Sequence, residues 1–313
     1  MTPTAQIAIY AVLIVIGSLL GGWAPSMFRL THARMQIIVS FVAGLMLGVG
    51  LWHMLPHSVG QLGSLDDAVG WMMFGLLGMF FLIRVFHFHQ HEVGIDNGDV
   101  AEQGHSHADC DHAGHVHHAS EGHTPAPSAH RLSWIGIALG LAVHTLIDGV
   151  ALAAAVVAEA HEHSAAAVFG LGTFLAVFLH KPLDALSITS LMLAGGWSPR
   201  ARQMVNLGFA LMCPLGAALF VLSVDNWVSE SEVVVGSALA FAAGTFLCIS
   251  LADLLPELQF HSHDRAKLSI SLLLGVALAY GIGFLEPAGL HGHHVHDQPP
   301  ASQSHGHDDH QHD

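Results

Sequence analysis

Eight apolar stretches constrain the fold of this 313-residue chain more than any other feature of its sequence. They cover residues 6–28, 37–58, 68–88, 132–158, 165–193, 203–224, 233–258 and 268–290. Each can cross a bilayer as a helix, which takes about 20 apolar residues for a hydrocarbon core of about 30 Å. Only 11% of the residues are charged, against about 25% in soluble domains. We therefore predict an all-α integral membrane protein with eight transmembrane helices in one domain, residues 1–313.

The basic residues indicate how these spans are oriented. All but one of the nine lysines and arginines lie on one side of an eight-span arrangement: Arg29, Arg34, Arg84, Arg131, Arg200, Arg202, Arg265 and Lys267. The loops on the other side and both tails contain none. By the positive-inside rule, the basic side faces the cytoplasm. This predicts a multi-pass protein of the plasma (inner) membrane with both termini extracytoplasmic.

Histidine is unusually frequent, with 28 residues in a chain of formal net charge −15. This balance provides no basic surface for nucleic acid, and imidazole and carboxylate groups favour divalent cations as partners. Eleven histidines lie in the predicted cytoplasmic loop 87–130 and eight in the predicted extracytoplasmic tail 291–313. We interpret both low-complexity segments as weak, multivalent metal-binding regions, with dispensable spacers as the alternative.

Two segments 200 residues apart are similar. Residues 41–58, FVAGLMLGVGLWHMLPHS, match residues 241–258, FAAGTFLCISLADLLPEL, at seven of eighteen positions without a gap. The predicted topology makes these two spans run in opposite directions. Similar spans of opposite direction indicate an inverted repeat, which in transporters surrounds a site near the membrane midplane. The alternative is the composition that membrane helices share.

A second pair of related motifs carries the candidate chemistry. HTLIDG (144–149) and HKPLDA (180–185) each place an aspartate four residues after a histidine, and residues i and i+4 share one helix face. Two antiparallel helices can therefore bring two imidazoles and two carboxylates to one point. Such donors suit zinc, iron(II) or manganese, and we take His144, Asp148, His180 and Asp184 as candidate metal ligands. The alternative is that each histidine–aspartate pair only satisfies itself by hydrogen bonding.

Polar residues near the ends of two other spans extend this candidate site toward both membrane faces. His53 and His57 close the second span on the outer side. Asp253 and Glu257 lie near the inner end of the seventh span, and His261 and His263 follow it. We interpret these six residues as a cation pathway. For His57 and Glu257 the alternative is ordinary solvation at the membrane interface.

These motifs resemble those of the ZIP family of metal-ion transporters across essentially the whole chain. The resemblance rests on HTLIDG, on HKPLDA, on the two repeated segments that end in Leu-Pro, and on the histidine-rich loop between the third and fourth spans. It implies eight helices in a 3+2+3 inverted-repeat bundle, a homodimer, and movement of divalent metal toward the cytoplasm. It also implies that one group of helices moves against another.

The resemblance also assigns roles to individual residues. The family's helix-four and helix-five motifs usually carry glutamate where this chain has Asp148 and Asp184, so its cage is shorter by one methylene at each position. A second-helix residue, here Met46, assists the same metal site. A second, adjacent metal site of many members uses positions that read Thr145, Lys181 and Cys213 in this chain. All three depart from the family pattern.

Lys181 is the most informative departure, because a charge within a spanning segment usually marks function. An ammonium group cannot bind a metal ion. We hypothesise that the protein has one core metal site and that Lys181 replaces the second cation. The alternative is a lysine side chain that extends away from the site toward the interface.

Together these features predict a transporter, not an enzyme, with a divalent metal ion as its substrate and no organic cofactor. Zinc is the first choice, with iron, manganese and cadmium also compatible with the ligands. Two alternatives use the same residues. One is a membrane-embedded metal-dependent hydrolase, in which the cage activates water. The other is a metal sensor derived from a transporter, as the altered second site suggests.

Overall fold

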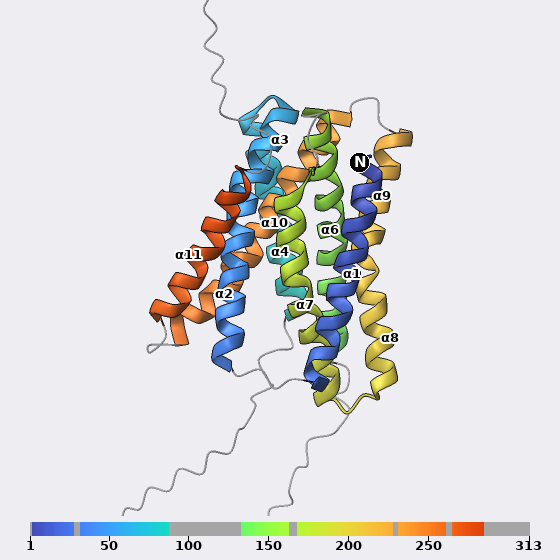
Figure 1. The fold of residues 1–313 in the computed structure, drawn as a ribbon, viewed down its shortest axis with the longest axis vertical. Helices are drawn as coiled ribbons and strands as arrows, with labels where there is room; N and C mark the ends of the chain where they lie inside the picture. The colour runs from blue at the N-terminus through green and yellow to red at the C-terminus, as the bar shows by residue number, and fades with distance from the viewer. Residues whose placement is uncertain are drawn as a thin grey trace, which may run out of the picture.

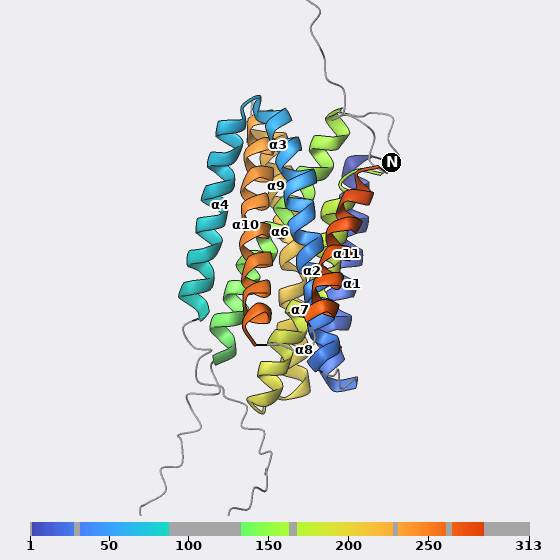
Figure 2. The ribbon, with the colours of Figure 1, turned by 90° about the vertical axis from the view of Figure 1, so that its left-hand side faces the viewer.

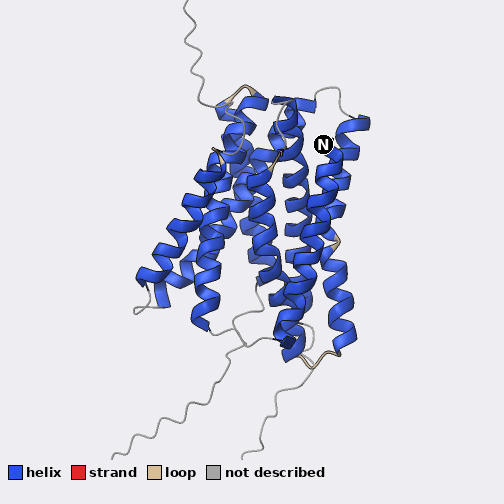
Figure 3. Cartoon of the chain, in the orientation of Figure 1, coloured by secondary structure: helices blue, strands red, loops and turns tan. Residues whose placement is uncertain are grey.

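The computed structural model describes residues 2–27, 32–87, 133–162, 168–227, 231–260 and 265–284. Within these ranges the ordered elements are all helical (Figure 3). They are α1 (Pro3–Met27), α2 (His32–Val49), the π-helix η1 (Gly50–Met54), α3 (Leu55–Leu62), α4 (Leu65–His87), α6 (Ser133–Glu162), α7 (Leu171–Ala194), α8 (Pro199–Ala210), α9 (Met212–Trp227), α10 (Ser231–Phe260) and α11 (Arg265–Ile282).

These elements form one elongated bundle, in which the described residues provide eight helices long and apolar enough to cross a membrane (Figures 1 and 2). The second span joins α2, η1 and α3, and the sixth joins α8 and α9. The predicted all-α architecture with eight spans is confirmed. Helix α1 begins and α11 ends at the same end of the bundle, drawn uppermost in Figure 1 and called the upper face below.

The fifth span begins later than predicted. The apolar run suggested a span over 165–193, but α7 begins at Leu171 after Gly170, whose φ of 64° lies in the left-handed region. An added Cβ at Gly170 would lie 2.8 Å from Val156 of α6, so the chain turns tightly there. Apolar composition alone cannot reveal such a turn. The eighth span was predicted to residue 290, whereas α11 ends at Ile282.

Two prolines explain the irregular spans. Pro56 has no N–H to donate to Trp52, and the helix widens just before it into the π-turn η1, where the Leu55 N–H bonds to the carbonyl of Gly50. Pro214 likewise has no N–H for Ala210, and the sixth span is interrupted at Leu211. Uniform helices were predicted across both segments, so both breaks are findings of the structure.

Glycines bring the spans together in pairs, the most extensively packed being α2–α11, α4–α10, α6–α9 and α1–α7. Two of these pairs repeat the same contacts 200 residues apart. A Cβ added to any of four glycines would overlap a carbonyl oxygen: Gly44 with Leu272, Gly275 with Phe41, Gly244 with Met72 and Gly75 with Phe241. Small residues allow such close approach of membrane helices. The contacts agree with the predicted inverted repeat.

These contacts yield a prediction for stability. Changing Gly75→Ala should lower the thermal unfolding midpoint in detergent by several degrees, because an overpacked contact costs about 1–3 kcal/mol. Gly70→Ala on the same helix is the matched control, since no atom lies within 4 Å of its added Cβ. Alanine there should leave the midpoint unchanged or raise it slightly. Equal midpoints for the two variants would contradict the packing described here.

Candidate metal site

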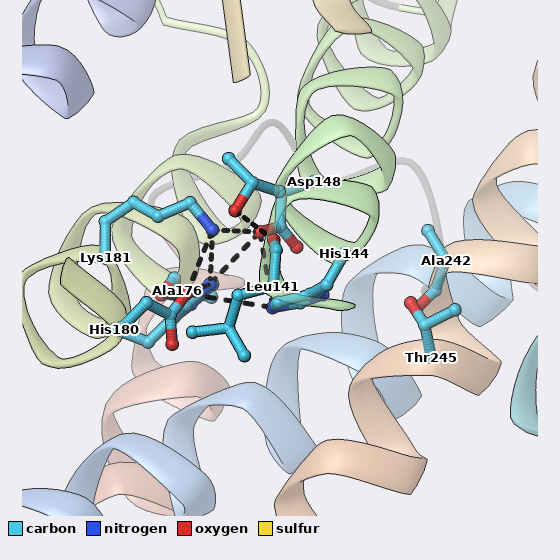
Figure 4. A network of polar contacts seen from close by, with 10 residues as sticks. Leu141, His144, Asp148, Ala176, His180, Lys181, Ala242 and Thr245 are labelled. Carbon is cyan, nitrogen blue, oxygen red and sulfur yellow. Dashed lines mark hydrogen bonds and ion pairs between the residues drawn. The ribbon is translucent and has the colours of Figure 1, made fainter. Parts of the chain in front are cut away.

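The candidate ligands meet where α6 lies beside α7. His144 and Asp148 are one turn apart on α6, and His180 and Asp184 are one turn apart on α7. Figure 4 shows His144, Asp148 and His180 turned toward one another. His144, Asp148 and His180 are 3%, 0% and 4% exposed, so the apolar bundle encloses three of the four groups.

Three ligand atoms lie close enough together to hold one metal ion. Asp148 Oδ2 lies 3.2 Å from His180 Nε2 and 3.4 Å from His144 Nε2. Zinc bound at about 2.0–2.1 Å in tetrahedral geometry separates its ligand atoms by about 3.3–3.4 Å. Among the residues that the structure describes, His144, Asp148 and His180 are the one group of three such ligands close enough to hold a single ion. The shortest contact joins α6 to α7, so the pairs do not simply satisfy themselves.

The hydrogen bonds of His180 direct a lone pair toward Asp148. His180 Nδ1 lies 2.7 Å from the carbonyl oxygen of Ala176, one turn earlier on α7 (Figure 4). A carbonyl can only accept, so Nδ1 carries the proton and donates it. In the neutral ring Nε2 is then an acceptor, and it faces the acceptor Oδ2 of Asp148. Two acceptors at 3.2 Å need a cation or a donor between them.

His144 and Asp148 present further unsatisfied atoms. Both ring nitrogens of His144 and Oδ1 of Asp148 are buried without a hydrogen-bond partner among the described residues. A buried polar atom without a partner costs free energy, and such atoms are uncommon in folded proteins. A metal ion at this point would bind His144 Nε2 and compensate the Asp148 charge. The donor set therefore fits a borderline divalent ion.

Asp184 lies at the open side of the cluster. Its Oδ2 is 3.8 Å from His180 Nε2 and 4.0 Å from His144 Nε2, farther than the contacts of Asp148. Its side chain is 20% exposed, whereas that of Asp148 is fully buried. A small movement of Asp184 would complete a four-ligand cage. The cluster is therefore least enclosed on this side.

Lys181 lies inside the cluster. Its Nζ donates to Asp148 Oδ2, lies 3.2 Å from Asp184 Oδ2 and 3.3 Å from His180 Nε2, and the residue is 1% exposed (Figure 4). The alternative that this lysine extends to the interface is therefore wrong. The ammonium satisfies the two facing acceptors of Asp148 and His180 at once. Nζ also lies 5.7 Å from the ring centroid of Phe209, on α8.

The other second-site positions offer little for a metal. Thr145 donates its hydroxyl to the carbonyl of Leu141 at 2.7 Å, within its own helix. Cys213 is fully buried on α9, where its backbone carbonyl packs against Gly149. Met46 is buried in the core on α2, which packs against α7. Its role as a ligand stays a prediction.

The predicted pathway residues are described unequally. His53 lies in η1, where its Nε2 donates to the carbonyl of Ala279 at 2.7 Å, and is 4% exposed. His57 is on α3 and 9% exposed. Asp253 and Glu257 lie along α10, but their side chains fall outside the described part of the chain. His261, His263 and the histidine-rich segments 88–130 and 291–313 also lie outside it.

Sequence reasoning missed Glu159. This residue lies near the end of α6, is 3% exposed, and places Oε1 4.0 Å from Nε2 of His57. The available signal was an acidic residue at the end of an apolar span, close to the Asp148 that the motif had already indicated. Such residues are usually solvated at the interface, whereas this one is buried.

Fold and site together define a class: a multi-pass membrane protein whose core contains buried histidines and a carboxylate close enough together to hold a metal ion. The sequence profile of the ZIP zinc transporter family matches residues 5–284. The zinc transporter ZIP9-B of Xenopus laevis is 27% identical, with 90% of this chain and 96% of that protein covered. ZIP9 of Micropogonias undulatus is 28% identical, with 85% and 89% covered. Mouse zinc transporter ZIP4 is 28% identical over 80% of this chain and 42% of that longer protein.

The chain belongs to the ZIP zinc transporter family. This membership confirms the resemblance noted in the sequence. It identifies the protein as a membrane protein of metal transport. The family is one of transporters rather than enzymes, so the hydrolase alternative is wrong.

Proposed function

We propose that this protein moves Zn²⁺ toward the cytoplasm through a single-ion site with His144, Asp148 and His180 as ligands. Asp184 provides the fourth ligand. The ion leaves the site on the side where Asp184 lies. The observation that carries the proposal is the spacing of 3.2 and 3.4 Å between Asp148 Oδ2 and the two histidine nitrogens. These distances are the ones that tetrahedral zinc requires.

Zinc is the preferred substrate for two reasons. The relatives that match this chain are named as zinc transporters. Two imidazoles with carboxylates form a donor set of intermediate softness, which suits zinc. Iron(II), manganese and cadmium accept the same donors, so competition among these ions belongs to the test.

The second positive charge of the site comes from Lys181. Where the family resemblance implies a second metal site, this chain has Thr145, Lys181 and Cys213, and the first and last are poor ligands here. Support comes from the contacts of Nζ with both Asp148 and Asp184, which give two buried carboxylates a permanent counter-charge. One divalent ion and the Lys181 ammonium then balance the charges of Asp148 and Asp184, in place of two metal ions.

The remaining assignments follow from the predicted orientation. The upper face is extracytoplasmic, so the ion passes His53 and His57 before the central site. It then passes Asp253, Glu257, His261 and His263 on the cytoplasmic side, near the histidine-rich loop. The protein is located in the plasma (inner) membrane, and it functions as a homodimer, as the family resemblance implies.

Uptake into proteoliposomes tests this proposal. The full chain should accumulate Zn²⁺ well above protein-free vesicles, and cadmium, iron(II) and manganese should compete to different extents. Uptake measured at two pH values shows whether protons accompany the ion. Zinc binding without flux at either pH would contradict the proposal and identify a sensor instead.

A further inference from the structure

Glu159 and His57 meet at the upper end of the bundle, far from the central cluster. Glu159 is in the last turns of α6, and His57 is on α3, the last part of the second span (Figure 1). Their side chains are 4% and 10% exposed, and His57 Nε2 lies 4.0 Å from Glu159 Oε1. A carboxylate and an imidazole from two helices therefore face each other just below the surface.

The backbone holds Glu159 in this orientation. Its second oxygen, Oε2, accepts a hydrogen bond of 2.8 Å from the N–H of Gly170, the residue that precedes α7. The turn at Gly170 has the left-handed φ of 64° that places this N–H beside the end of α6. A partner that orients a carboxylate in this way is typical of metal sites, where outer hydrogen bonds fix the ligand. Oε1 remains directed at His57.

Helix α6 connects this pair to the central site. Glu159 follows Asp148 by eleven residues, which is about three turns and roughly 16 Å along the helix, so both carboxylates lie on nearly the same face. Leu152 and Ala155, between them on that face, are 0% and 4% exposed. An apolar layer thus separates Asp148 from Glu159, so the two residues belong to separate sites along one helix.

We propose that His57 and Glu159 form a second binding site for the same class of ion, a borderline divalent cation such as Zn²⁺, at the upper end of the protein. The site captures the ion before it reaches the central cluster. Tetrahedral zinc separates a nitrogen and an oxygen ligand by about 3.3–3.4 Å, so the present 4.0 Å closes with a side-chain adjustment of well under 1 Å. Water completes the coordination.

The substitution Glu159→Gln isolates metal binding from structure. Glutamine can still accept the hydrogen bond from Gly170, but it lacks the charged oxygen that binds the ion. In proteoliposomes the KM for Zn²⁺ should rise about tenfold while the maximal rate changes less than twofold. Glu232→Gln is the control, because Glu232 is an exposed acid in the first turn of α10 at the same end. Its KM should not change.

A structural readout separates this site from the central one. In crystals of the full chain grown with Zn²⁺, anomalous scattering should reveal an ion between His57 and Glu159. That peak should persist in Asp148→Asn, even where uptake is lost, and disappear in Glu159→Gln. An unchanged KM in Glu159→Gln, a fall of the maximal rate alone, or the absence of this ion in Asp148→Asn would each overturn the proposal. The KM measurement rests on the proposed transport of Zn²⁺, whereas the anomalous peak between His57 and Glu159 tests this site even if the central site fails.

Discussion

Asp148→Asn is expected to reduce the initial rate of zinc uptake at least about 100-fold. Asp148 Oδ2 is the atom nearest to both histidine nitrogens and to Lys181, and its side chain is fully buried. The amide removes the charge that holds the ion and leaves Lys181 with only the partly exposed Asp184. Even groups that merely orient metal ligands change affinity by about 10–100-fold, so a direct ligand should have a larger effect. Uptake of radioactive or fluorescently detected zinc into proteoliposomes measures the rate.

Two further aspartates calibrate this result. Asp184→Asn should have a smaller effect, because its carboxylate lies 3.8–4.0 Å from the histidine nitrogens and is 20% exposed. Asp66→Asn, at an exposed position in the first turn of α4, should leave uptake unchanged. If Asp148→Asn kept more than a tenth of the rate, or if Asp184→Asn were the more damaging, the assignment of the ligands would be wrong.

Lys181→Met is expected to make the stability of the protein depend strongly on zinc. Removing one partner of a buried ion pair typically costs about 3–5 kcal/mol, because the other charge is left uncompensated. Here the loss of Nζ leaves Asp148 and Asp184 without their counter-charge. Zinc restores that charge, so the unfolding midpoint in detergent should fall sharply with a chelator and largely recover with zinc.

Lys267→Met is the matched control for Lys181→Met. Lys267 is an exposed lysine in the first turn of α11, so its replacement removes the same charge from an exposed position. The unfolding midpoint of Lys267→Met should stay close to that of the wild-type protein, both with a chelator and with zinc. If zinc failed to restore Lys181→Met, or if the wild-type protein gained as much from zinc as the variant, Lys181 would not be acting as a resident cation.

The number and class of the spans follow from hydropathy, because a helix inside a bilayer must be apolar along its whole length. Departures from regular helix are harder to anticipate. Pro56 and Pro214 indicate where a backbone hydrogen bond is missing. They do not indicate that the helix forms the π-turn η1 near Pro56 and breaks at Leu211 near Pro214. The late start of α7 depends on the left-handed Gly170, which looks like any other small residue within an apolar run.

The site could be predicted in part for a similar reason. The spacing of four residues puts His144 and Asp148 on one helix face, and repeats for His180 and Asp184, so local geometry suffices for each half. The shortest contacts cross from α6 to α7, and only tertiary packing makes Asp148, rather than Asp184, the central carboxylate. Packing also decides that Lys181 turns inward. Glu159 meets His57 across 102 positions of sequence with no motif to connect them.

The most direct test of the account is a count of metal ions in the central cluster. Crystals of the full chain saturated with Zn²⁺ and measured at the zinc absorption edge would locate every ordered ion. The account predicts one central ion, bound by His144, Asp148 and His180, with the Lys181 ammonium on its other side. Two adjacent ions at full occupancy between α6 and α7, with Lys181 displaced from both aspartates, would contradict it.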